Sequence, residues 1–301
     1  MENLSAFPKI FALGSKYISN IFDKLFEITE KVDGSQFVFG KIDGELKIRS
    51  KGAIIIPDAP PKMFKAGVEY VLSLSSTLPD NIVFYCEYLS KPKHNILKYD
   101  RIPLNHLALF GVEEPHAGFM PYISLIYWSK TLKIDLVPIL YSSVETGYST
   151  EEAIKLLTRP SFLGGTNIEG IVIKSFQEFW VGGRVLPIMS GKYVSEAFKE
   201  VHRKTWASEK STTGKWKKFK EGFCTEARWL KAVQHLKEEE KLLSDLKDIG
   251  SLINEVKKDI GEEEKEEIKT FLWRLFGKEL LHSSVKGLPE WYKKHLALGG
   301  D

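Results

Sequence analysis

A lysine just ahead of an Asp-Gly turn is the first feature of this sequence that could do chemistry. Lys31 stands two residues before Asp33-Gly34, within the segment from Glu30 to Ser35. Alone the pattern is weak evidence, because Asp-Gly turns beside lysines are common in surface hairpins. A neutral lysine amine is nevertheless a nucleophile, and nearby cations lower its pKa from the ordinary value of about 10.4. The turn gains chemical meaning if further charged residues gather around it.

Five later segments set charged or aromatic residues into apolar, strand-like surroundings. They are, in chain order, residues 49–52, 84–88, 107–112, 169–174 and 191–194. Taken singly, Glu87 is equally well explained by an edge strand facing water, Phe110 by the core and Lys192 by the surface. Those explanations must all hold together if no site exists. The ordered set therefore favours a functional site over six unrelated structural details.

This ordered set resembles the motifs of the covalent nucleotidyltransferases, the superfamily of ATP-dependent ligases and mRNA capping enzymes, over residues 25 to 200. Within it, the sequence is most similar to RNA ligases of the phage double-strand type. Only 30 residues precede Lys31, nothing after residue 200 predicts an OB barrel, and the C-terminal region looks helical. The resemblance implies an ATP-dependent RNA ligase that joins 5′-phosphate and 3′-hydroxyl ends through a lysyl-AMP intermediate and an adenylylated RNA 5′ end.

The resemblance also implies which residues act on ATP. Lys31 is the expected nucleophile, and Lys174 and Lys192 are the expected cations that lower its pKa and neutralise charge on the α-phosphate. Glu169 is the expected ligand of a divalent ion, Mg²⁺ or Mn²⁺, because hard oxygen ligands suit magnesium. Two positions depart from the family pattern: Gly111 stands where an acid is common, and Val194 where some relatives have a second lysine.

Five more residues are expected to bind the nucleotide by the same resemblance. Glu30 should lie against the adenine, largely through its backbone, and Phe110 should stack on it. Glu87 should accept hydrogen bonds from the ribose hydroxyls. Gln36 should help to orient the α-phosphate, and Arg49 should contact ribose or phosphate.

The elements that must position these residues read as an α+β fold with antiparallel sheets. We expect a meander with turns at Asp33-Gly34 and Asp43-Gly44, a helix over 62–74, and strands over 82–89, 106–112, 168–174 and 184–192. Ser149 and Glu152 predict a capping box. The resemblance adds that residues 1–200 form an ATP-grasp-like adenylyltransferase domain. The last of the expected site residues is Lys192, so ATP chemistry is expected to be complete within that domain.

Residues 201–301 are expected to form an all-helical domain that contacts RNA. Apolar residues recur there every three or four positions from Thr225 onward, with interruptions expected at Gly250 and Gly261. The stretch from 202 to 220 holds seven Lys or Arg and one acid, interleaved with three aromatic residues, Trp206, Trp216 and Phe219. Cations for phosphates and rings for bases would suit RNA. An exposed linker between domains explains the stretch equally well.

The composition excludes other classes of protein. With 301 residues, 36 aromatics and 43% hydrophobic residues, the chain cannot be disordered throughout. The longest apolar run, 119–128, is about half of a membrane span, so no membrane partner is expected. Two cysteines make no disulfide framework, and no signal peptide is evident, which predicts a cytoplasmic protein or one that is intracellular in a host.

Two alternatives stay open beside the RNA ligase. A small DNA ligase or a capping guanylyltransferase would share the motifs, although the missing OB pattern argues against both. A non-catalytic protein that binds RNA ends would share the fold, although the retained lysines and acids argue against it. Among candidate RNA substrates, the sequence does not choose between a nicked duplex, a broken tRNA loop and a single strand.

Overall fold

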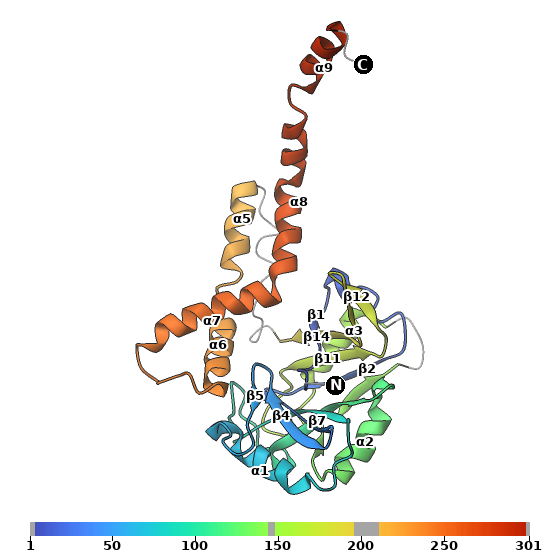
Figure 1. Cartoon of the computed structure of the whole chain (residues 1–301), viewed down its shortest axis with the longest axis vertical. Coiled ribbons are helices and arrows are strands. Elements are labelled where there is room, and N and C mark those ends of the chain that lie inside the picture. The colour runs from blue at the N-terminus through green and yellow to red at the C-terminus, as the bar shows by residue number, and fades with distance from the viewer. Residues whose placement is uncertain (1–3, 144–147, 196–210, 299–301) are drawn as a thin grey trace. The chain divides into compact units, whose positions relative to one another are not determined.

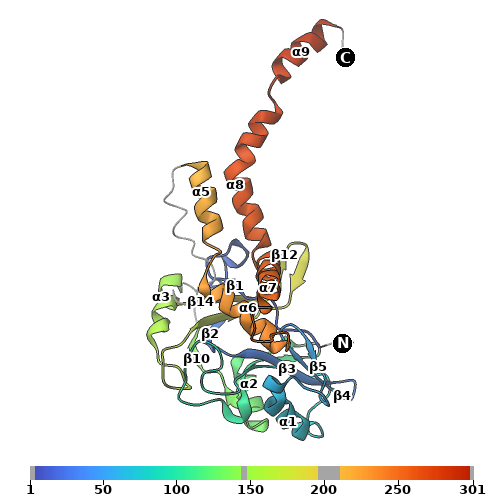
Figure 2. The ribbon, with the colours of Figure 1, turned by 90° about the vertical axis from the view of Figure 1, so that its left-hand side faces the viewer.

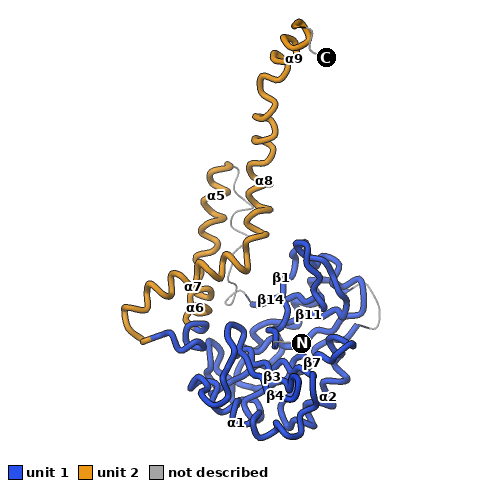
Figure 3. The backbone as a smooth tube through the Cα atoms, in the orientation of Figure 1, with its two compact units in different colours: residues 1–199, 234–242 blue, residues 200–233, 243–301 orange. Residues whose placement is uncertain are grey.

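The computed structural model describes residues 4–143, 148–195 and 211–298. The chain divides into two compact units, and each is described by itself. Unit 1 comprises residues 1–199 together with Gln234–Leu242, and unit 2 comprises 200–233 and 243–301 (Figure 3). The segment Gln234–Leu242, which the sequence pattern places with the C-terminal helices, thus belongs to unit 1.

Unit 1 is built on two main sheets (Figure 1). The first, sheet A, has the strand order β1 (Phe11–Ala12), β14 (Met189–Val194), β11 (Gly170–Ser175), β2 (Phe26–Lys31), β10 (Ile139–Ser142). The second, sheet B, has the order β5 (Ile54–Ile55), β4 (Glu45–Ser50), β3 (Ser35–Ile42), β6 (Val83–Tyr88), β7 (Leu107–Glu114), β8 (Gly118–Phe119), and β9 (Asp135–Leu136) pairs with β7. A separate hairpin joins β12 (Phe179–Val181) to β13 (Arg184–Leu186). Most pairings are antiparallel, as predicted; β1 with β14 and β7 with β9 are parallel.

The predicted meander is right at one turn and wrong at the other. Asp43 and Gly44, both with positive φ, connect β3 to β4 in a hairpin. Asp33-Gly34 makes no hairpin, because β2 pairs with β10 and β11 whereas β3 pairs with β4 and β6. The chain crosses from sheet A to sheet B at this turn, directly after Lys31.

Helices cover the outer faces of the two sheets (Figure 2). Alternation along β3 sends Phe37 and Phe39 to one face, where they form a core with Val68 of α1 (Lys65–Leu74) and Leu125 of α2 (Tyr122–Thr131). On sheet A, Ala153 of α3 (Thr150–Lys155) belongs to a second core that includes alternate residues of β11. With their outer faces buried this way, the two sheets leave their inner faces for the site.

The other predicted elements of unit 1 are confirmed with small shifts of boundary. The helix expected over 62–74 begins as a 3₁₀ turn, Lys62–Phe64, and continues as α1. Ser149 accepts from the backbone N–H of Glu152, whose side chain accepts from Ser149 in return, so the capping box is present. The strand expected over 184–192 is two strands, β13 and β14.

Unit 2 is helical. Its helices are α5 (Thr212–Glu221), the first part of α6 (Glu226–Glu238), α7 (Asp248–Glu263), α8 (Lys265–Ser284) and α9 (Leu288–Ala297). The expected interruptions at Gly250 and Gly261 are wrong, because α7 runs through both glycines. One glycine costs a helix only about 1 kcal/mol, so the two glycines do not by themselves end the helix.

Two of the three aromatic residues in the basic stretch 202–220 pack in the hydrophobic core of unit 2. Phe219 is buried and stacks on Phe271, with ring centroids 3.7 Å apart, so its predicted role as a platform for bases is wrong. Trp216 packs against the same cluster. Ser211 caps α5 by accepting from the N–H of Gly214, so this part of the stretch is helix and not linker. Trp206 lies outside the described residues. No helix in the described ranges is long and apolar enough to cross a bilayer.

Candidate active site

Three lysines share one face of sheet A. Lys31 pairs with Gly170, Lys192 pairs with Val172, and Lys174 lies two residues further along β11 than Val172. Because side chains alternate along a strand, residues at these positions point to the same side in successive rows, about 7 Å apart. The register thus brings the three predicted catalytic lysines together on the inner face of the sheet.

Lys31 is held by Glu169. Its Nζ lies 2.7 and 2.6 Å from the two carboxylate oxygens. Burial lowers the pKa of Lys31, but the charges of Glu169 and Glu87 and the hydrogen bonds to Glu169 outweigh it, so the pKa is raised. Burial in turn raises the pKa of Glu169 to about 7, against the lowering effect of Lys31. The expected lowering of the Lys31 pKa is therefore not found in this structure, in which Lys31 is paired with Glu169.

Burial lowers the pKa of Lys174, in contrast to Lys31, whose pKa is raised overall. Lys174 is buried, its Nζ donates to the carbonyl of Phe110, and it lies over the rings of Phe110 and Phe7, 5.4 and 5.9 Å from their centroids. Burial lowers its pKa to about 8, although the charge of Glu27 opposes this. Since Phe110 belongs to β7, this contact shows that the inner faces of the two sheets meet here.

Sheet B contributes the residues opposite the lysines. Gln36 on β3 pairs with Glu87 on β6, which pairs with Ala108 on β7. The next pairings along β6 are Cys86 with Leu109 and Tyr85 with Gly111, so Phe110 is the unpaired residue of a β-bulge. Bulges redirect a side chain out of the regular alternation.

Glu87 shares its electrostatic environment with Lys31. Burial raises the pKa of Glu87 to about 8; Lys31 lowers it, whereas the charges of Glu169 and Glu238 raise it further. The register sets Glu87 on the face of sheet B that also carries Gln36, opposite to the face on which Phe37 and Cys86 enter the core. A carboxyl at this place can accept or donate hydrogen bonds to a polar substrate near neutral pH.

The turn between the sheets is fixed from several sides. The Asp33 carboxylate accepts from the backbone N–H groups of Ile96 and Leu97, and the Asp33 N–H donates to the Tyr99 hydroxyl at 2.8 Å. At Gly34 an added Cβ would come within 2.7 Å of the backbone oxygen of Tyr88. Only glycine fits that approach, so packing against Tyr88 requires glycine at position 34.

Three residues that were expected to contact the nucleotide form hydrogen bonds with other protein groups in this structure. The Glu30 side chain lies on the other face of β2, where the Ser161 hydroxyl and a backbone N–H donate to it at 2.5 and 3.1 Å. The Gln36 Oε1 accepts from the N–H of Phe7 at 3.2 Å, and Arg49 donates to the carbonyl of Leu4 at 2.9 Å. Their roles toward ATP stay predictions, and any contact of Glu30 with adenine must come from its backbone.

Sequence reasoning missed the N-terminal segment 4–7. Phe7 is buried and packs edge-on against Phe110, Tyr85 and Phe119, with centroids 5.1 to 5.3 Å apart. Its ring therefore fixes the aromatic residue that was expected to stack on adenine. No local pattern marks this phenylalanine, because its partners lie about eighty or more residues further along the chain.

A buried hydroxyl on the same face of sheet A lacks a partner. Ser190 pairs with Lys174 across β11 and β14, and its Oγ is fully buried with no hydrogen-bond partner among the described residues. An unpaired buried hydroxyl is costly, so it marks a place where a polar ligand or water would be stabilised.

Glu169 is the residue best suited to hold a divalent ion. Within the described ranges no group of three or more His, Cys, Asp or Glu side chains is gathered as a metal cluster. Mg²⁺ fits such a site, because it is commonly held by one or two carboxylates together with waters and substrate phosphates. The donor chemistry of Glu169 is therefore compatible with the predicted ion.

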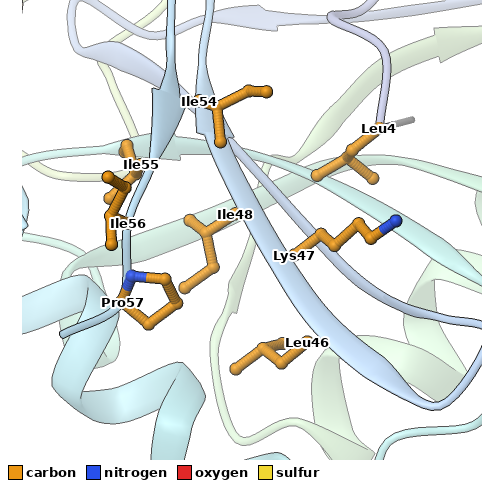
Figure 4. A pocket seen from close by; sticks show the side chains of 8 residues that line it. All are labelled: Leu4, Leu46, Lys47, Ile48, Ile54, Ile55, Ile56 and Pro57. Atoms are coloured by element: carbon orange, nitrogen blue, oxygen red, sulfur yellow. The ribbon is translucent and has the colours of Figure 1, made fainter. Parts of the chain in front are cut away.

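An apolar pocket of about 160 Å³ lies elsewhere on sheet B (Figure 4). It is lined by Leu4, Leu46, Lys47, Ile48, Ile54, Ile55, Ile56 and Pro57. None of the predicted site residues lines it, and its walls carry almost no polar groups. It is not suited to phosphate chemistry.

Comparison with known proteins follows the same region of the chain. A family model described as RNA ligase matches residues 24–194, which include all nine predicted site residues. An RNA ligase of Naegleria gruberi solved with pyrophosphate superposes with a TM-score of 0.50 at 20% identity, covering 65% of this chain and 59% of that chain. An apo mutant of that ligase gives a TM-score of 0.51 at 17% identity, covering 66% and 57%. At such identity the likeness is one of fold, and this chain spans less than two thirds of those chains. No curated protein matches the sequence.

Proposed function

The chain belongs to the RNA ligase family, and from that premise we propose that it joins RNA 5′-phosphate and 3′-hydroxyl ends at the expense of ATP. The observation that carries the proposal is the set of three lysines on one face of sheet A, with Glu169 on the nucleophile and Glu87 opposite. A nucleophilic lysine surrounded by cations and a metal-binding carboxylate is what covalent nucleotidyl transfer needs.

In the first step the Lys31 amine attacks the α-phosphorus of ATP. A nitrogen–phosphorus bond forms, the bond to the pyrophosphate oxygen breaks, and pyrophosphate leaves. The amine must be neutral, so the charge on Glu169 that raises the pKa of Lys31 has to be compensated. A divalent ion bound at Glu169 would supply that compensation. Lys174 and Lys192 then stabilise the negative charge that develops on the α-phosphate.

The remaining two steps move the activated phosphate to RNA. An oxygen of the RNA 5′-phosphate attacks the lysyl-AMP phosphorus, which breaks the nitrogen–phosphorus bond and restores Lys31. The 3′-hydroxyl then attacks the 5′-phosphorus of the adenylylated end, and AMP leaves. Both steps use the same place for AMP, so residues that hold it serve the whole cycle.

The nucleotide would be held by residues on the two inner faces. Phe110, redirected by its bulge, is placed to stack on adenine, and Glu87 to accept from the ribose hydroxyls. Gln36 and Arg49 are within the same region, next to the N-terminal segment. The hydroxyl of Ser190, which needs a partner, lies beside Lys174 and could donate to a phosphate oxygen.

The experiment that tests this function is labelling of the protein with α-labelled ATP and Mg²⁺ or Mn²⁺, followed by sealing assays. We expect the label on Lys31 and on no other lysine. Nicked duplexes with RNA or DNA flanking strands, a cleaved tRNA loop and a single strand would then define the substrate. Labelling by GTP alone would favour a capping enzyme, and sealing restricted to DNA strands would favour a DNA ligase. A role in repair inside a cell follows if RNA ends are the preferred substrate.

A further inference from the structure

A segment more than 190 residues after the nucleophile turn contacts that turn directly. Gln234–Leu242 belongs to unit 1, as Figure 3 shows by its colour. The Gln234 Nε2 donates to the carbonyl of Gly34 at 2.9 Å, and the Ser35 hydroxyl donates to the Glu238 carboxylate at 2.5 Å. Gln234 and Glu238 are four residues apart on α6, so both face the turn.

The contact is a closed and buried network. The Gln234 Nε2 also donates to Glu238 at 2.8 Å, and a ring nitrogen of His94 lies 2.9 Å from the Ser35 hydroxyl. Ser35 is 1% exposed and Glu238 is 6% exposed. A carboxylate buried to this degree is stable only with hydrogen-bond partners, so Glu238 and Ser35 hold each other in place.

The turn held in this way sets the position of two site residues. It follows Lys31 without a hairpin to support it, because the chain is crossing between sheets. Gly34 is also packed against Glu87: an added Cβ would lie 2.7 Å from its Cγ. A shift of the turn therefore moves the nucleophile relative to the residue expected to bind the ribose.

We propose that Gln234 and Glu238 are positioning residues for the transfer of AMP to Lys31, acting through the turn from Asp33 to Ser35. The inference rests on the proposed function for the reaction that it affects. It departs from the expectation that ATP chemistry is complete within residues 1–200. The first step depends on a segment of the C-terminal third of the chain.

The first test measures the turn without ATP. Hydrogen exchange of the peptide covering residues 31–36 is compared in the full-length wild type and in Gln234→Ala, Glu238→Ala and Glu238→Gln. Glu240→Ala is the matched control, because Glu240 anchors the same segment by accepting from the N–H of Lys62, away from the turn. We expect faster exchange in both alanine variants at Gln234 and Glu238, and unchanged exchange in the control. Equal exchange in all proteins overturns the proposal.

The second test measures the reaction in the same proteins. At saturating ATP the rate of Lys31 labelling should fall about 10- to 100-fold in Glu238→Ala with little change in the KM for ATP, because a misplaced nucleophile slows the chemical step. Glu238→Gln keeps an oxygen that accepts from Ser35 and should recover most of the rate. A raised KM with an unchanged maximal rate, or no recovery with glutamine in a folded protein, overturns the positioning role.

The two tests separate this inference from the proposed function. A wild type that labels at the same rate as Gln234→Ala and Glu238→Ala overturns the inference and leaves the function standing. A wild type that takes no label from ATP overturns the function and with it the catalytic part of the inference. The exchange measurement still decides in that case whether the segment holds the turn.

Discussion

Lys31 meets both oxygens of Glu169, at 2.7 and 2.6 Å, and this pair sets the starting state of the chemistry. An ammonium in such contact stays protonated at neutral pH, and its raised pKa says the same. The ion pair with Glu169 thus favours the protonated form of the Lys31 amine. Attack requires the carboxylate to be neutralised, which links the two residues expected to bear AMP and the divalent ion.

Replacing the nucleophile should abolish labelling. Lys31→Ala removes the amine that forms the nitrogen–phosphorus bond, so no labelled protein is expected with α-labelled ATP. Lys41→Ala is the control, because Lys41 on β3 pairs with Asp80 and is not among the site residues. The measurement is the radioactivity retained by the denatured protein. Full labelling of the Lys31 variant would place the nucleophile elsewhere.

The cation Lys174 should give the first step an alkaline limit. Its pKa is about 8, so it loses its charge as the pH rises through that value, and its stabilisation of the transition state disappears with the charge. The labelling rate should therefore fall above pH ~8 in the wild type. Lys174→Arg keeps the charge, because arginine is not deprotonated in proteins, and should remove this limit. A wild-type rate that keeps rising to pH ~10 would contradict the assignment.

Removal of either cation should be costly. Lys174→Ala and Lys192→Ala each delete a charge that acts more strongly in the transition state than on bound ATP. Loss of one such group typically lowers the rate by about 10² to 10³. Single-turnover labelling of folded variants, verified by circular dichroism, measures this loss. Rates near that of the wild type in both variants would exclude these lysines from the active site.

The sequence predicts antiparallel sheets, and it names candidate site residues, because strands and motif segments leave short-range signals. The strands are runs of β-branched and aromatic residues, such as Phe37, Val38 and Phe39, and the motif segments are contiguous runs. The crossing at Asp33-Gly34 was missed because an Asp-Gly pair looks the same whether its flanking strands pair with each other or with strands far away. Strand pairing is a long-range property that a local turn signal does not contain.

No local sequence pattern marks the residues that hold the site in place. Gln234 and Glu238 lie on an ordinary charged helix, and their bonds to the turn span 200 and 203 residues. Phe7 is one of eighteen phenylalanines. Hydrogen bonds and ring contacts between such distant residues depend on the folded geometry, and residue type alone does not distinguish them from surface or core positions.

Glu87 should cost the folded protein stability at neutral and higher pH. Its pKa is raised to about 8 in the folded chain, so between the ordinary value and pH 8 the folded state holds a proton that the unfolded state has released. The free energy of unfolding therefore falls as the pH rises through this window. Glu87→Gln removes the titration, so its stabilising effect should be largest at pH ~8 and above and absent at pH ~4.

Urea unfolding at a series of pH values measures the difference for Glu87→Gln. Glu69→Gln, on the exposed face of α1, is the matched control and should show no such dependence. The same Glu87 variant should label more slowly with ATP if the carboxylate binds the ribose. Equal stability of wild type and Glu87→Gln at every pH would show that the folded state does not raise this pKa.

The lysines of α5 should supply part of the affinity for RNA. Lys217 and Lys220 are exposed on this helix, whereas the neighbouring Phe219 is buried in the core of unit 2. Lys217→Gln with Lys220→Gln removes two positive charges and leaves Phe219 in place, although Lys220 also lies over the ring of Trp216, 5.5 Å from its centroid. For each RNA phosphate that the variant no longer neutralises, the slope of log affinity against log salt should fall by about 0.7 for a single strand and 0.9 for a duplex.

The slope is obtained by measuring binding to a nicked RNA duplex by fluorescence anisotropy over a range of salt concentrations. Lys293→Gln with Lys294→Gln on α9 changes the charge equally and is the control. ATP labelling should be unaffected in both variants, because the lysines expected to act on the α-phosphate all lie in unit 1. An identical salt dependence in the α5 variant and the wild type would show that RNA is bound by another surface.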